Sequence, residues 1–207
     1  MKPVCSLVLL FVFAPWAQAA DPIKQRVQKF VKELESESSG ERRRAASELR
    51  KMGSLAKDAA PALAKLLGDE SLWVTDEVVK ALKAMAPDSI EPVAKMLKSR
   101  STVARIHAAE LLEHWGERAA EQLKLMLPAL KDEDQRVRLP VARTIGKFGE
   151  PAAPGCYRLL TARNADHREA AAIALAGIGP ATFTKLRTTL KGRNDYGRAG
   201  AAVALGY

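Results

Sequence analysis

Cysteine, aromatic residues and long apolar runs are all scarce in this sequence. It has two cysteines in 207 residues, and aromatic side chains make up 5% of it. Two cysteines exclude a small fold held together by several disulfides. With so few aromatic side chains, the core has to be built mainly from Ala, Leu, Val and Ile. Small and straight-chain apolar residues favour closely packed helices over strands.

The one long apolar run lies at the amino terminus and is too short to span a bilayer. It covers about 11 residues from Val4, whereas a transmembrane helix needs roughly 20. Lys2 precedes the run, and Ala17-Gln18-Ala19 after it has the pattern of a signal-peptidase site. The sequence therefore predicts a cleaved signal peptide at residues 1–19 and an exported protein, periplasmic or secreted. Cleavage would remove Cys5 and leave Cys156 as the one cysteine.

What the rest of the chain has in abundance is internal repetition. Leucine-type residues recur at intervals of 33 or 30, at Leu49, Leu82, Leu112, Ile145, Leu175 and Leu205. Three residues before each lies a smaller apolar residue: Ala46, Val79, Ala109, Ala142, Ala172 and Ala202. Four residues after the first five lies a small residue suited to end a helix: Gly53, Ala86, Gly116, Gly149 and Gly179. Columns that stay in phase over so many units predict stacked helical repeats.

Two motifs in these units resemble the HEAT-repeat superfamily, in particular its short bacterial, bilin-lyase-like (PBS lyase HEAT-like) form. One is the acidic turn that leads into Val-Arg on a first helix, Asp132-Glu133-Asp134-Gln135-Arg136-Val137-Arg138. The other is the second-helix pattern Ala60-Pro61-Ala62-Leu63-Ala64-Lys65-Leu66-Leu67. Val74-Thr75 replaces Val-Arg in the second unit, so the arginine column is incomplete. The resemblance covers residues 41–205 and implies a fold, because members of the superfamily serve many functions.

We therefore predict an all-α fold, a right-handed α-α superhelix of the HEAT-like α-solenoid type. It would have about five helical pairs plus terminal half-units. After the signal peptide at 1–19, residues 20–40 are expected to form an amino-terminal capping helix and residues 41–207 the repeat domain. The expected units are 41–70, 71–100, 101–133, 134–164, 165–194 and a partial unit at 195–207.

The residues that could form a metal site or act as a nucleophile each have a simpler structural interpretation. His107, Glu110 and His114 share one stripe of a helix, but the two histidines lie two turns, about 10 Å, apart along the axis. A polar flank is therefore favoured over a metal site. Cys156 has no Cys-His-acid arrangement around it in sequence and is interpreted as a small core residue. We predict no catalytic residue, no metal, no cofactor and no enzymatic activity.

Positive charge gathers in the second half of the chain. Residues 134–194 carry eleven basic side chains against four acidic ones. Seven of them are candidate partner-binding residues: Arg158, Lys185, Arg187, Lys191, Arg193, Arg136 and Arg138. Helical spacing brings Arg187 and Lys191 onto one flank, with Arg158 on the equivalent helix one unit earlier. The residues Arg158, Arg187 and Lys191 are called the basic strip below.

These features predict an exported scaffold for protein–protein interaction, whose partner could be acidic. The alternative is an extracytoplasmic polyanion-binding module that uses the basic half of the chain. Nucleic acid is disfavoured because aromatic residues are sparse and because the chain is predicted to be exported. An enzyme with a metal or cysteine site is the third hypothesis. No segment after the signal peptide is apolar enough to span a membrane.

Overall fold

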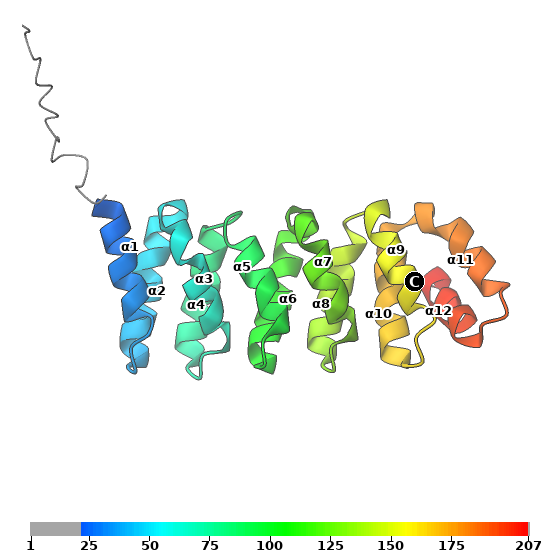
Figure 1. The fold of residues 1–207 in the computed structure, drawn as a ribbon, viewed down its shortest axis with the longest axis horizontal. Helices are drawn as coiled ribbons and strands as arrows, with labels where there is room; N and C mark the ends of the chain where they lie inside the picture. Colours follow the sequence, from blue (N-terminus) through cyan, green and yellow to red (C-terminus); the bar gives the residue numbers. More distant parts are fainter. Residues whose placement is uncertain (1–21, 207) are drawn as a thin grey trace, which may run out of the picture.

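The computed structural model describes residues 22–206 and shows two layers of helices stacked side by side along one axis (Figure 1). The predicted signal peptide at 1–19 lies outside the described residues, so it stays a prediction. Residues 22–206 contain helices and turns and no strand. The predicted all-α solenoid is confirmed. No helix within 22–206 is both long and apolar enough to cross a membrane.

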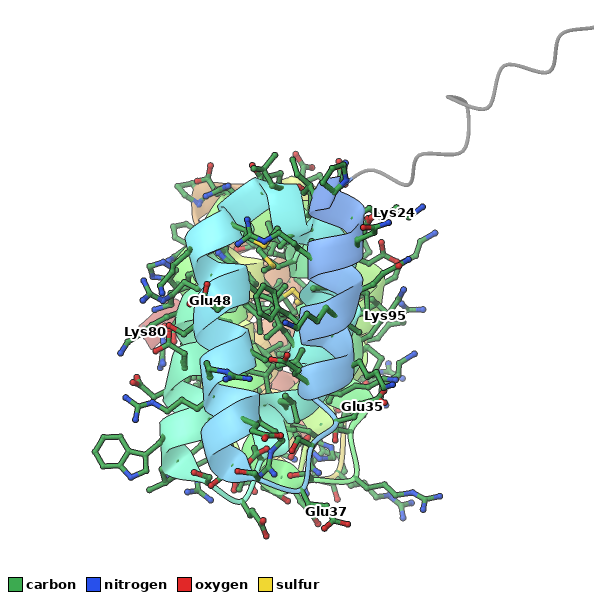
Figure 2. All side chains as sticks on the ribbon, turned by 90° about the vertical axis from the view of Figure 1, so that its left-hand side faces the viewer. Lys24, Glu35, Glu37, Glu48, Lys80 and Lys95 are labelled. Atoms are coloured by element: carbon green, nitrogen blue, oxygen red, sulfur yellow. The ribbon has the colours of Figure 1, made fainter. Side chains whose placement is uncertain are left out.

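One layer, called here the first-helix layer, consists of the longer helix of each unit. Its members are α2 (Ser39–Met52), α4 (Leu72–Ala84), α6 (Thr102–Trp115), α8 (Gln135–Gly146), α10 (Ala165–Ile178) and α12 (Asp195–Gly206). Each begins within two residues of a predicted unit boundary or, for α2, of residue 41. This layer carries Glu48 and Lys80 on its outer side (Figure 2).

The opposite side of the molecule, the second-helix layer, is built from shorter α-helices joined to 3-10 segments. The α-helices are α1 (Pro22–Glu33), α3 (Ala60–Lys65), α5 (Ile90–Lys95), α7 (Leu123–Met126), α9 (Ala153–Leu159) and α11 (Phe183–Leu190). The 3-10 segments are η2 (Gly53–Ala59), η3 (Leu66–Gly68), η4 (Met96–Lys98), η5 (Gly116–Gln122), η6 (Leu127–Lys131), η7 (Glu150–Ala152) and η8 (Pro180–Thr182). Lys24 and Lys95 point outward from this layer (Figure 2).

The columns seen in the sequence form the interior between the layers. Leu49, Leu82, Leu112, Ile145 and Leu175 are fully buried. Four residues of the smaller column are fully buried as well: Ala46, Ala109, Ala142 and Ala172. Val79 is half-buried and Ala202 is exposed. Within 22–206 no helix packs on the outer side of α12, which explains why Ala202 departs from its column.

Local sequence accounts for where the first helices begin and end. Three of them start at a side chain that accepts a hydrogen bond from a first-turn N–H: Ser101 for α6, Asp134 for α8 and Asn164 for α10. The predicted stop column follows the helix ends, and Gly53, Gly116, Gly149 and Gly179 have φ between 55° and 84°. That backbone region is costly for residues with a Cβ, which explains why the column is mostly glycine.

An arginine on the first helix ties successive units together at the turns. Arg42 donates through Nη1 to the carbonyl oxygens of Ser36 and Glu37, each at 2.9 Å, which closes its own turn. Its Nε and Nη2 donate to both carboxylate oxygens of Asp69, in the next turn along the stack, at 2.7 and 2.9 Å. Arg105 repeats the arrangement, with Nε 2.7 Å from Oδ2 of Asp132. In the second unit Thr75 takes the arginine position, and its hydroxyl contacts the carbonyl oxygens of Asp69 and Ser71.

Candidate binding surfaces

Large apolar side chains are exposed at the start of two neighbouring first helices. Leu72 and Trp73 open α4 and are 77% and 71% exposed, and Val103 in the first turn of α6 is 46% exposed. An exposed tryptophan is uncommon on a surface that meets only water, since burial of its ring is worth several kcal/mol in a core or an interface. These residues mark this edge of the first-helix layer as a candidate contact surface.

A groove between α4 and α6 continues from this edge. Its volume is about 290 Å³, and Leu72, Thr75, Asp76, Val79, Lys83, His107, Glu110 and Leu111 line it. Leucine and valine form the apolar part of the lining, and two carboxylates, a lysine and a histidine form the polar part. On the other side of Trp73, a smaller hollow is lined by Ser39, Gly40, Arg43 and Ser71. The Arg43 guanidinium carbon lies 5.6 Å from the centre of the Trp73 ring, a cation–π distance.

The histidine stripe of α6 forms one wall of this groove. His107 Nδ1 lies 3.3 Å from Oε2 of Glu110, while His114 is exposed further along the helix. Within residues 22–206 no group of three or more His, Cys, Asp or Glu side chains is placed to hold a metal ion. The arrangement offers a polar flank with one histidine–carboxylate contact at the groove.

Cys156 lies inside the solenoid. It is fully buried, and burial raises the pKa of its thiol to about 12. A thiol with such a pKa stays protonated at neutral pH, and only the thiolate is a good nucleophile. The structure therefore places Cys156 among the core residues.

The seven candidate basic residues fall into three groups. Four are exposed and form no ion pair in the described part of the chain: Arg158, Arg187, Lys191 and Arg193. Lys185 is exposed too, and its Nζ lies 4.2 Å from the centre of the Tyr157 ring. The Tyr157 hydroxyl donates to the carbonyl oxygen of Thr182 at 3.0 Å, which fixes the ring under the lysine.

The remaining two, Arg136 and Arg138, are already engaged within the chain. Arg136 is exposed but pairs with Asp134 at 2.7 Å, and this contact lowers the pKa of Asp134 to about 2. Arg138 is 6% exposed and uses Nη1 to bind the carbonyl oxygens of Asp132 and Glu133. Its Nη2 lies 3.2 Å from Oδ2 of Asp166. Arg138 therefore belongs to the arginine column of the turns and is left out of the candidate surface.

A second groove, on the second-helix layer, was not anticipated from the sequence. It lies between α7–η6 and α9, has a volume of about 530 Å³, and is called the basic groove below. Lys124, Leu127, Pro128, Lys131, Gly155, Arg158 and Leu159 line it. Arg158 thus shares a groove with two lysines of the preceding unit. The seven-residue spacing of Lys124 and Lys131 around Leu127 was the one signal that could have indicated it.

The family comparison agrees with the fold. A family model described as HEAT repeats matches residues 27–99 and 90–155. It does not test the finer resemblance to the bilin-lyase-like form, which stays a prediction. Among curated protein sequences, none matches this one significantly.

Several solved structures are similar in arrangement. An engineered protein aligns with a TM-score of 0.48 at 19% identity and covers 87% of this chain and 97% of its own. A designed armadillo repeat protein has a TM-score of 0.46 at 17% identity, with 87% and 98% covered. Another, solved in complex with the peptide (KR)4, has a TM-score of 0.47 at 18% identity, again with 87% and 98% covered.

Proposed function

Because this chain belongs to the HEAT-repeat family, we propose that it is an exported scaffold that binds another protein through the first-helix layer. The observation that carries the proposal is the exposure of Leu72 and Trp73, 77% and 71%, beside the groove between α4 and α6. Tryptophan is enriched among the residues that dominate protein–protein binding energies, and such residues tend to sit next to pockets. The partner would bury Trp73 and place a side chain in the groove.

The interior of the molecule also favours a binding role over a catalytic one. Within residues 22–206, every buried side-chain nitrogen or oxygen has a hydrogen-bond partner. The core therefore presents no unpaired polar group that a substrate would complete. Burial raises the pKa of the Cys156 thiol to about 12, which disfavours the thiolate that a covalent mechanism would use.

Substitution at the exposed edge tests this function. The double variant Leu72→Ala, Trp73→Ala should lose more than about tenfold in affinity for a partner captured from the envelope fraction, since truncating one central anchor commonly has that effect. Leu55→Ala is the matched control, because Leu55 is also an exposed leucine, at 63%, but lies in η2. Equal capture by wild type and the double variant, with unchanged helicity, would reject the first-helix layer as the binding surface.

Export rests on the amino-terminal pattern alone and has its own test. The full chain should be recovered outside the cytoplasm, and sequencing of its amino terminus should begin at Ala20. Recovery in the cytoplasm with residues 1–19 intact would reject export and leave the scaffold proposal standing.

Polyanion binding is the second candidate function, and a specific observation favours it. Arg158, Arg187, Lys191 and Arg193 are exposed, and no carboxylate of the described residues pairs with any of them. Several unpaired cations on consecutive units produce a positive potential that attracts anionic chains at low salt.

A further inference from the structure

The basic groove carries more positive charge than the hollows between the first helices. The hollows between α4 and α6, between α6 and α8, and between α10 and α12 each include acidic residues. The small hollow at Trp73 has one cation, Arg43. The basic groove has three cations, Lys124, Lys131 and Arg158, and no carboxylate in its lining. None of the three cations forms an ion pair with another described residue. Three unpaired cations around one hollow give it a locally positive potential.

The floor of the basic groove is apolar. Leu127, Leu159 and Pro128 line it between the cations. Gly155 brings α9 close to η6, because a Cβ added there would lie 2.6 Å from Cδ2 of Leu127. Leu127 is half-buried and so keeps part of its side chain accessible, whereas Leu159 is 8% exposed. The floor can therefore receive an apolar side chain.

From this geometry we propose that the basic groove binds an acidic peptide segment of a partner protein, with one apolar side chain set between carboxylates. The carboxylates would meet Lys124, Lys131 and Arg158, and the apolar side chain would cover Leu127. Arginine and lysine bind carboxylates by charge-assisted hydrogen bonds, and Arg158 can do so with two parallel bonds. An apolar floor distinguishes such a peptide from a sulfated polysaccharide, which has no apolar side chain to place on it.

The site lies on the opposite layer from Leu72 and Trp73, so it does not depend on the proposed function of the first-helix layer. A scaffold with both surfaces could hold two protein segments at once. If the first-helix layer fails its test, binding at the basic groove can still be measured by itself.

The experiment uses two fluorescent peptides, Glu-Glu-Leu-Glu-Glu and Glu-Glu-Ser-Glu-Glu, and follows fluorescence anisotropy with residues 20–207. The leucine peptide should bind at low salt, and the serine peptide should bind several-fold more weakly because the floor is then unfilled. A triple variant should bind the leucine peptide roughly tenfold more weakly, since its three charges act on one ligand. Its substitutions are Lys124→Gln, Lys131→Gln and Arg158→Gln. Leu127→Ser, a change to a half-buried residue, should reduce the preference for leucine over serine.

The matched control removes three charges from the neighbouring region. Arg187→Gln, Lys191→Gln, Arg193→Gln changes the net charge equally but leaves the basic groove intact. It should bind the leucine peptide nearly as well as wild type. Equal weakening by the two triple variants would overturn the proposal in favour of diffuse charge. Equal affinity for the two peptides would overturn it in favour of a polyanion site, and heparin would then compete with both. No measurable binding of the leucine peptide at low salt would also overturn it.

Discussion

Single arginines at the turns connect one unit of this solenoid to the next. Each of Arg42 and Arg105 binds carbonyl oxygens of its own turn and a carboxylate 27 residues further along the chain. The side chains of Arg105 and Asp132 are 11% and 8% exposed, so this pair is shielded from water. Loss of one member of a shielded pair leaves the other charge without a partner. This destabilises the fold by more than an exposed ion pair stabilises it.

The first prediction concerns Arg105. Arg105→Ala should lower the free energy of unfolding by roughly 2–4 kcal/mol, because the Asp132 carboxylate, whose side chain is 8% exposed, would lose its cation. Denaturant unfolding followed by circular dichroism measures the change. Arg136→Ala is the control, since Arg136 pairs with Asp134 at the surface, and its effect should be much smaller. If the two variants were equally stable, the turn arginines would not be structural.

The Asp69 carboxylate should make stability depend on pH. Burial by itself would raise the pKa of Asp69, but the Arg42 guanidinium and the Ser71 backbone N–H bind the carboxylate, and the net pKa is lowered. A carboxyl whose pKa is lower in the folded state stabilises fully above its unfolded value of about 3.9, and this stabilisation is lost as the pH falls below it. The free energy of unfolding of wild type should therefore decline below about pH 4. The free energy of unfolding of Asp69→Asn should decline less steeply over the same pH range. If wild type and variant declined in parallel, the pH dependence would not come from Asp69.

The role of a residue could be predicted from the sequence where it follows from helical spacing, and not where it depends on the three-dimensional path of a turn. Burial of Cys156 and of the alanine column follows from spacing alone, because a helix repeats its face every 3.6 residues. The role of Arg138 could not be predicted in that way. An arginine just after a turn can point to solvent or to the carbonyl oxygens of that turn, and which it does depends on where the turn backbone lies in three dimensions. The sequence alone therefore leaves Arg138 among the binding candidates, whereas in the structure its guanidinium binds the turn.

At the scale of the helices, the first-helix layer is regular and the second-helix layer is not. The first helices have the predicted register because caps and glycines delimit them. The second helices alternate between α and 3-10 geometry, as in η5, α7 and η6. No periodic pattern in the sequence distinguishes i→i+3 from i→i+4 hydrogen bonding over such short stretches. The basic groove between η6 and α9 was missed for this reason.

The register of α8 has a direct test in Ala142. This residue is fully buried in the smaller column, at the face where α8 packs against its neighbours. Ala142→Leu should overpack the interior and lower the free energy of unfolding by about 1–3 kcal/mol. The next residue, Arg143, is exposed and pairs with Glu113 at 2.6 Å, so Arg143→Leu should cost less than about 1 kcal/mol. Equal costs in thermal or denaturant unfolding would contradict the observed register.

At the scale of the whole molecule, charge divides the solenoid along its length. Residues 134–194 have a net charge of +7, from eleven basic and four acidic side chains. The units before them are close to neutral. Arg136 and Arg138 pair with two of the four carboxylates, Asp134 and Asp166, so the excess charge comes from the other basic residues. The unpaired members lie mainly on the second-helix layer, at Arg158, Arg187 and Lys191, which form the basic strip. The positive potential should therefore be strongest over this part of the molecule and the adjoining basic groove.

Retention on heparin tests whether the basic strip acts as a polyanion site. Arg158→Gln, Arg187→Gln, Lys191→Gln should elute at clearly lower salt than wild type, because removing a cation that binds a sulfate or phosphate group weakens the salt-dependent part of the affinity. The control Lys24→Gln, Lys57→Gln, Lys65→Gln removes the same charge from exposed positions in the first units. It should elute close to wild type, since charges farther away than the Debye length of about 8–10 Å are largely screened. Equal shifts for both variants would indicate an effect of net charge alone. No shift for either would mean that the basic strip is a solvated face, and the protein-binding surfaces would then account for the function without it.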